Sequence, residues 1–238
     1  MKLDLLLAAS LAVLSISPAL ARDAVFVSPD QSHTFQILPT PPAADSDTTK
    51  AELAELHRIE ATRTEAEIAQ AKFDDENENI FLFKNVMGDK FTKDNLPLTA
   101  AFAARVRGDE GVNTEAAKVG FHRIRPYNLD KTLHPVCKVK AKDDAYPSGH
   151  ATSGYLLALT LIDMIPEKRD AILARAEEYG HNRLVCGVHY STDVPASKLL
   201  AYTIHAIMEV SPQYQKELAV AKAELRQALG LDIQDAKK

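Results

Sequence analysis

Apolar residues recur every three to four positions over most of this chain, which is the spacing of amphipathic helices. Residues 80–83 add a short buried turn or helix, and Gly108-Asp109-Glu110-Gly111 is expected to break one helix before Asn113 caps the next. No stretch alternates as a strand would, so the sequence predicts an all-α, single-domain helical bundle. The expected helices cover residues 50–73, 97–107, 113–125, 148–165, 166–184, 195–210 and 212–229.

The first 49 residues do not share this pattern. Residues 1–21 combine a basic start, an apolar stretch and small residues ending at Ala21, which is typical of a signal peptide cleaved after Ala21. A membrane anchor is the alternative, but the apolar stretch is short for a span. Residues 22–49 predict an extended N-terminal arm that lies over a helical domain formed by residues 50–238. The mature chain is therefore expected in the periplasm or secreted.

Composition excludes some classes of function. The formal net charge of the 238 residues is -5 at pH 7, and without a basic stripe nucleic acid is not expected as a partner. The strongest later apolar run contains Asp163 and stops at Pro166, so no integral membrane segment is expected in the mature chain. Cys137 and Cys186 indicate a disulfide in an exported protein, with two buried free thiols as the alternative. No metal site and no cofactor is predicted, because no histidine cluster supplements the cysteines. The sequence is compatible with a homo-oligomer.

The tetrapeptide Pro147-Ser148-Gly149-His150 precedes the most apolar predicted helix. Ser148 is a good N-cap, and the unpaired N–H groups of a helix N-terminus attract anions. Gly149 has no side chain to block an anion, and His150 adds a titratable ring in the first turn. An ordinary capped helix with one surface histidine is the alternative.

Two other polar clusters stand out. Lys118 and Arg125 are seven positions apart, about two helical turns, so both could face one anion; a solvated basic helix face is the alternative. Farther along, Arg183 precedes His189 and Asp193, which are four apart. On a helical turn Asp193 can accept the Nδ1–H of His189, which leaves Nε2 as a nucleophile. Alone, this pair would more often be a structural hydrogen bond.

Together the three clusters resemble the motifs of the type 2 phosphatidic acid phosphatase (PAP2) superfamily, which includes bacterial class A acid phosphatases and vanadium haloperoxidases. The segments that match are Lys118 to Pro126, Pro147 to His150, and Arg183 to Asp193. From roughly Ile37 to Leu229 the chain is similar to the class A nonspecific acid phosphatases in particular, through stretches such as Arg123-Ile124-Arg125-Pro126.

The resemblance implies hydrolysis of small phosphate monoesters without a metal. His189 would attack phosphorus and form a phosphohistidine, Asp193 would orient His189, and His150 would act as general acid and then as general base. Phosphoryl transfer needs mainly positioning and charge stabilisation, which cationic side chains can supply. The groups that would hold the phosphate are Lys118, Arg125, Ser148, Gly149 and Arg183.

Two departures from the family pattern bear on substrate range. Asn182 stands where the superfamily often has Ser, and Asp144-Ala145 stands where class A members usually have Gly-Ser. A carboxylate at Asp144 is expected to repel substrate or to change the preferred leaving group. Alternative functions for the same site are a vanadate-dependent haloperoxidase, although that family's chains are much longer, and a soluble lipid-phosphate phosphatase. A non-enzymatic anion-binding protein would not need the oriented His–Asp pair.

Overall fold

The most apolar stretch of the chain forms helix α8 (Gly149–Met164), which lies at the centre of the molecule. The structure is a computed structural model that describes residues 24–232, so the predicted signal peptide lies outside the described residues. Leu156, Leu157 and Leu161 of α8 are completely buried, and burial of each such side chain stabilises the fold by about 1.5–3 kcal/mol.

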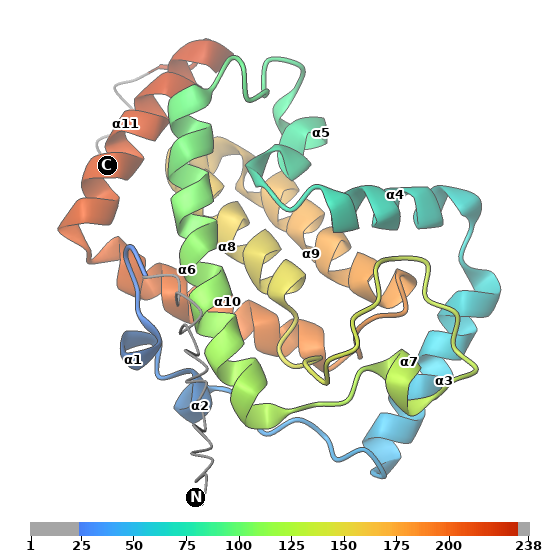
Figure 1. The fold of residues 1–238 in the computed structure, drawn as a ribbon. Helices are drawn as coiled ribbons and strands as arrows, with labels where there is room; N and C mark the ends of the chain where they lie inside the picture. The colour runs from blue at the N-terminus through green and yellow to red at the C-terminus, as the bar shows by residue number, and fades with distance from the viewer. Residues whose placement is uncertain (1–23, 233–238) are drawn as a thin grey trace, which may run out of the picture.

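Four long helices surround α8 in Figure 1: α6 (Pro97–Phe121), α9 (Arg169–Val185), α10 (Asp193–Glu209) and α11 (Pro212–Leu229). Helices α3 (Asp47–Thr62) and α4 (Glu65–Glu76) pack against α9. The short elements are η1 (Ile80–Phe83), α5 (Lys84–Met87), α7 (Pro126–Leu129) and η2 (Pro166–Lys168). Residues 24–232 contain no strand, so the predicted all-α fold is confirmed.

A glycine permits the close packing of α8 on α9. A Cβ at Gly154 would lie 2.5 Å from Cδ1 of Tyr179, closer than real Cβ contacts come. The fully buried Tyr179 ring therefore lies directly against the α8 backbone. Since α8 starts and α9 ends at the same side of the molecule, this contact fixes the relative placement of His150 and Arg183.

The predicted break within residues 97–125 is wrong at Gly108 to Gly111, because α6 continues through these residues. Glycine costs a helix about 1 kcal/mol relative to alanine, and contacts distant in sequence offset that cost. The Asp109 carboxylate accepts hydrogen bonds from the backbone N–H groups of Val25, Phe26 and Val27 at 2.6–2.7 Å. Asn113 donates to the carbonyl of Val27 instead of capping a new helix.

The N-terminal arm lies over the domain and is tied to it by these bonds. Phe26 and Val27 are buried in the main core. The arm also contains two single-turn helices, α1 (Pro29–Ser32) and α2 (Thr34–Ile37). Burial of its apolar residues explains why a segment without helical periodicity has a defined path.

The loop that follows α7 is fixed by the predicted disulfide. Cys137 in this loop is bonded to Cys186, which follows α9, and their Cα atoms are 5.1 Å apart. Such a crosslink contributes about 2–4 kcal/mol by restricting the unfolded chain. The loop therefore stays against the ends of α4 and α9.

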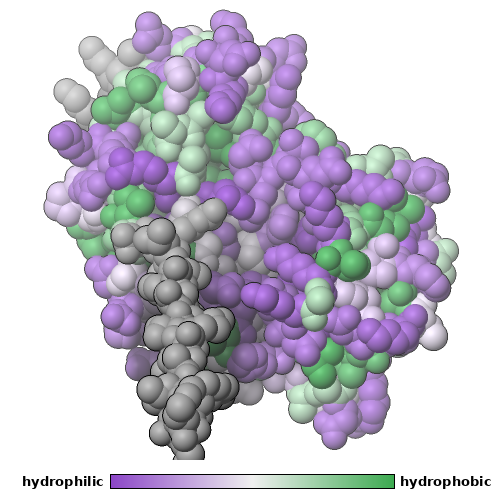
Figure 2. Space-filling view, viewed as in Figure 1, coloured by the Kyte–Doolittle hydropathy of each residue, from purple (hydrophilic) through white to green (hydrophobic). Residues whose placement is uncertain are grey.

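The surface seen in Figure 2 is mainly hydrophilic, with apolar residues in separate patches. Among the described residues, no helix combines the length and the apolar character needed to cross a bilayer.

Candidate active site

Most of the predicted site residues line one cavity of about 120 Å³, which we call the His150–His189 cavity. Its predicted members are Lys118, Arg125, Gly149, His150, Arg183 and His189. They come from α6, from the segments before α7 and α10, from the start of α8 and from the end of α9. Three more lining residues were missed in the sequence: Asp75, Lys138 and Lys140.

His189 is buried and held by hydrogen bonds on both ring nitrogens. Its Nδ1 lies 3.1 Å from Asp193 Oδ2, and its Nε2 lies 2.9 Å from Nη1 of Arg125. A guanidinium can only donate, so Nε2 must be the acceptor and Nδ1 must carry the hydrogen. The geometry thus places the lone pair of the ring at Nε2, on the side of the cavity.

The surroundings of His189 favour the neutral imidazole. Burial lowers its pKa well below the usual range, and the nearby charges of Arg125, Lys118 and Arg183 lower the pKa further. A neutral ring with an oriented lone pair is the form in which histidine acts as a nucleophile.

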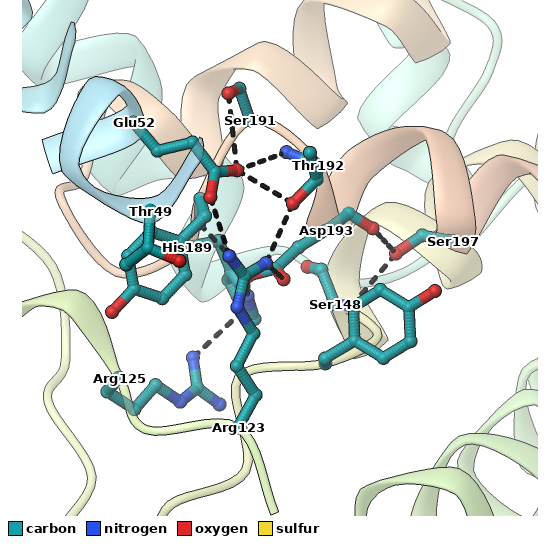
Figure 3. Close-up of polar contacts among 12 residues, drawn as sticks. Thr49, Glu52, Arg123, Arg125, Ser148, His189, Ser191, Thr192, Asp193 and Ser197 are labelled. Atoms are coloured by element: carbon teal, nitrogen blue, oxygen red, sulfur yellow. Dashed lines mark hydrogen bonds and ion pairs between the residues drawn. The ribbon is translucent and has the colours of Figure 1, made fainter. Parts of the chain in front are cut away.

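Asp193 is positioned by a buried network that joins α3 to α10 (Figure 3). Its Oδ2 also accepts from the N–H of Tyr190 at 2.9 Å, and its Oδ1 accepts from Arg123 at 2.5 Å. Arg123 donates in addition to Glu52 at 2.6 Å and to Thr192 Oγ1 at 2.8 Å. Burial raises the pKa of Asp193 to about 6, and the Arg123 charge opposes this rise. Arg123 therefore compensates the carboxylate that orients His189.

His150 reaches the cavity from the first turn of α8. Its Nε2 donates to the backbone carbonyl of Asp75 at 3.2 Å, and the carboxylates of Asp75 and Glu78 lie 3.8 Å and 4.0 Å from the same atom. Desolvation of the ring and the charge of Arg183 lower the pKa of His150 to about 4, while Glu78 and Asp75 oppose this. His150 and His189 therefore lie in the same cavity.

Lys118 and Arg125 meet at the cavity, but not from one helix as expected. Helix α6 ends at Phe121, and His122 adopts a left-handed conformation with φ 47°. Arg125 then has extended backbone before Pro126. Two-residue spacing in an extended segment directs side chains to the same side, so Arg123 and Arg125 both reach the His189–Asp193 pair.

Asp144 pairs with the cations of the cavity, a contact that the sequence did not indicate. Its Oδ1 lies 2.7 Å from Nη2 of Arg125, and its backbone carbonyl accepts from Lys118 Nζ at 2.6 Å. Burial, with Arg125 beside it, lowers the pKa of Lys118 to about 8. Lys118 is therefore protonated at acid and neutral pH.

Arg183 has a carboxylate partner that the sequence did not indicate. Nη1 of Arg183 donates to Asp75 Oδ1 at 2.8 Å, which places an acidic residue of α4 in the cavity wall. The neighbouring Asp74 faces the other way and pairs with Arg175. Asn182, one of the two departures from the family pattern, donates to Asp74 at 2.7 Å and so belongs to this buried network.

Ser148 and Gly149 form the start of α8 as predicted. Ser148 Oγ caps the helix by accepting from the N–H of Ala151 at 3.2 Å, and it does not line the cavity, so its contact with phosphate stays a prediction. A Cβ at Gly149 would lie 3.3 Å from Oε1 of Glu110. Burial and the charge of Glu78 raise the pKa of Glu110 to about 8, which keeps this neighbour of the helix N-terminus uncharged at acid pH.

Two groups of potential metal ligands occur in the described residues, and neither completes this site. Asp75 lies near Cys137 and Cys186, but disulfide sulfurs are not the thiolates that bind metals. Asp163, His205 and Glu209 form the other group, in which His205 pairs with Asp163 at 2.8 Å. Asp163 belongs to the last turns of α8, at the opposite end from His150.

The chain is similar to one family model and to several known proteins. The family model described as the PAP2 superfamily matches residues 97–217. The chain is 33% identical over 148 residues to the non-specific acid phosphatase of Providencia stuartii, covering 60% of this chain and 59% of that protein. It is 31% identical over 210 residues to the non-specific acid phosphatase of Salmonella typhimurium, covering 84% of this chain and 83% of that protein. The acid phosphatase of Zymomonas mobilis is 33% identical over 138 residues, covering 56% of this chain and 52% of that protein.

The family match contains every predicted site residue from Lys118 to Asp193. The match to the Salmonella protein extends over most of both chains. The chain therefore belongs to the PAP2 superfamily, in which the non-specific acid phosphatases are its relatives.

Proposed function

We propose that this protein is an exported acid phosphatase, which hydrolyses phosphate monoesters through a phosphohistidine on His189 without a metal ion. One observation carries the proposal: His189 is fixed by Asp193 with its Nε2 lone pair at a cation-lined cavity that also contains His150. The names of the acid phosphatase relatives support the reaction class. The apolar leader and the disulfide support export, because disulfides persist in oxidising compartments.

The first half-reaction transfers the phosphoryl group to the enzyme. The lone pair of His189 Nε2 forms a bond to phosphorus while the phosphorus–oxygen ester bond breaks. The leaving oxygen keeps the bonding electrons and takes a proton from His150. Lys118, Arg125 and Arg183 hold the equatorial oxygens, where charge develops. Asp193 stabilises the positive charge on the phosphorylated imidazole.

The second half-reaction returns the enzyme to its first state. His150, now neutral, accepts a proton from water as the water oxygen bonds to phosphorus. The nitrogen–phosphorus bond breaks, and its electrons return to Nε2. Orthophosphate leaves, and His150 is again protonated.

A panel of phosphomonoesters, assayed with and without EDTA, tests the reaction class and the metal independence. We expect hydrolysis of several unrelated esters, and the same rates after exhaustive chelation, because the cavity cations provide the charge stabilisation. Loss of activity with EDTA, restored by a divalent cation, would contradict the metal-free mechanism. Activation of bromide oxidation by vanadate would favour a haloperoxidase instead.

The pH dependence tests the two histidine roles. His150 must be protonated to act as an acid, so kcat/KM should fall as the pH rises above its pKa of about 4 in the free enzyme. The negative phosphoryl group of bound substrate favours the charged ring and raises this pKa. We therefore expect the alkaline limb of kcat at a higher pH than that of kcat/KM.

The acid limb should follow the His189–Asp193 pair, because His189 must be neutral and Asp193, whose pKa burial raises to about 6, must be ionised to orient it. His150→Gln is the control, and it should flatten the alkaline limb of kcat. Coincident alkaline limbs for kcat and kcat/KM, or a profile flat from about pH 5 to about pH 9, would argue against these assignments.

A further inference from the structure

Two lysines that the mechanism does not use line the mouth of the His150–His189 cavity. Lys138 and Lys140 are exposed residues of the loop after α7, and both line the cavity. The sequence does not show that these two lysines lie near the cavity, because they belong to a segment without helical periodicity.

The backbone beneath these lysines is held at three points. The N–H of Lys138 donates to Asp75 Oδ2 at 3.2 Å. The N–H of Lys140 donates to Tyr127 Oη at 2.7 Å, and that hydroxyl donates back to the Lys140 carbonyl at 2.9 Å. The disulfide of Cys137 provides the third attachment. The two side chains therefore extend from a fixed backbone, which lowers the entropy lost when they bind a ligand.

Within the described part of the chain, the side-chain charges of Lys138 and Lys140 are not neutralised by a carboxylate partner. Neither ammonium group makes an ion pair there, whereas Arg125 pairs with Asp144 and Arg183 pairs with Asp75. Lys140 nevertheless lies close enough to the inner site to affect the pKa values of Lys118 and Asp144.

The inner cations can contact every free oxygen of one phosphoryl group. A bound phosphoryl group has three non-bridging oxygens, and three cationic side chains, Lys118, Arg125 and Arg183, line the inner end of the cavity. Asp144 and Asp75 each neutralise one of the two arginines, so the inner end keeps a small positive charge. Lys138 and Lys140 at the mouth are then left to attract a second anionic group. Lysine is a common point-charge binder of phosphate, and its flexible stem tolerates ligands of different length.

We propose that Lys138 and Lys140 form a second anion subsite, which makes the enzyme prefer esters that carry a second phosphoryl group a few bonds from the first. This inference rests on the proposed phosphatase function. One phosphoryl group lies in the inner site and reacts, and the second lies between the two ammonium groups at the mouth. The substrate class is that of short bisphosphates.

A matched pair of substrates tests the subsite: propane-1,3-diol bisphosphate and propyl phosphate. Two equivalent ends alone give the bisphosphate a statistical advantage of about twofold in kcat/KM. We expect about a tenfold advantage, because two ammonium groups attract the second phosphoryl group. Added salt should shrink this ratio, because these charges are exposed.

The double variant Lys138→Gln/Lys140→Gln should bring the ratio down to about two, since both attracting charges are gone. Lys142→Gln is the matched control, because Lys142 is an exposed lysine of the same loop that does not line the cavity. Its replacement should leave the ratio of the two kcat/KM values unchanged. A parent ratio of about two, or a double variant that keeps the parent ratio, would overturn the subsite.

Calorimetric binding of both compounds to the His189→Ala variant separates this inference from the proposed function. If the parent hydrolyses neither ester, the phosphatase function fails. Binding then still tests the subsite. His189→Ala should bind the bisphosphate about tenfold more tightly than propyl phosphate, and adding Lys138→Gln/Lys140→Gln should remove this difference. Equal affinities for the two compounds would contradict the subsite even if hydrolysis is observed.

Discussion

Replacement of His189 by alanine should reduce the turnover of phosphate monoesters by about 10⁴-fold or more, because no other described group presents a nitrogen lone pair oriented by Asp193. The fold should survive at some cost in stability, because Asp193 keeps its hydrogen bonds to Tyr190 and Arg123 when the imidazole is removed. Steady-state kinetics with p-nitrophenyl phosphate, together with circular dichroism, measure the two properties. His181→Ala is the matched control, because His181 is an exposed histidine near the end of α9, outside the cavity.

Rapid acid-free quenching with a ³²P-labelled ester should trap a phosphoenzyme in the parent and none in His189→Ala. A phosphoramidate bond is labile to acid and stable to alkali, which identifies histidine as the acceptor. His150→Ala should accumulate this intermediate with a good leaving group, because the base for the second half-reaction is missing. Label that persists in His189→Ala would assign the nucleophile to another residue.

Replacement of Arg123 by alanine should lower the free energy of unfolding by about 3–5 kcal/mol, because it leaves two buried carboxylates without their cation. Arg123 is 6% exposed and bonds to both Glu52 and Asp193. Urea unfolding should show a lower midpoint with an unchanged slope. The activity of the folded fraction should also fall, since Asp193 would no longer be held as a carboxylate beside His189.

Arg169→Ala is the control for this experiment. Arg169 is an exposed arginine paired with Asp170, and loss of such a pair costs about 1 kcal/mol at most. Arg123→Lys should recover only part of the loss, because one ammonium cannot reproduce the two-sided contact of a guanidinium. A loss below about 1 kcal/mol in Arg123→Ala would contradict a compensating role.

Local signals were sufficient to predict most of the helices and the polar residues at their ends. The expected helix over residues 50–73 is divided, because Thr64 caps a new helix, so α3 ends at Thr62 and α4 begins at Glu65. The break expected within α6 is absent. Ser148 caps α8 as expected, since capping depends on neighbouring residues alone. The disulfide followed from an even number of cysteines. The His189–Asp193 bond followed from their four-residue spacing. These features involve interactions over a few residues, or residue types whose chemistry is unambiguous.

Features that depend on distant contacts could not be predicted. The continuity of α6 requires Asp109 to bind the N–H of Val25, which lies 84 positions away. Asp75 joins the site through Arg183, which lies 108 positions away. The end of α6 depends on a left-handed His122, which no glycine marks. Residue types alone do not reveal such long-range pairs.

In the tethered loop after α7, the side chains of the proposed subsite are different from the groups that hold the loop in place. Its main chain is anchored by Cys137, Asp75 and Tyr127, while Lys138 and Lys140 project outward. Exposed substitutions usually change stability by no more than about 0.5 kcal/mol. Substitutions at positions 138 and 140 can therefore change substrate preference with little effect on stability. Related enzymes with the same fold can differ in the esters they prefer through these two positions.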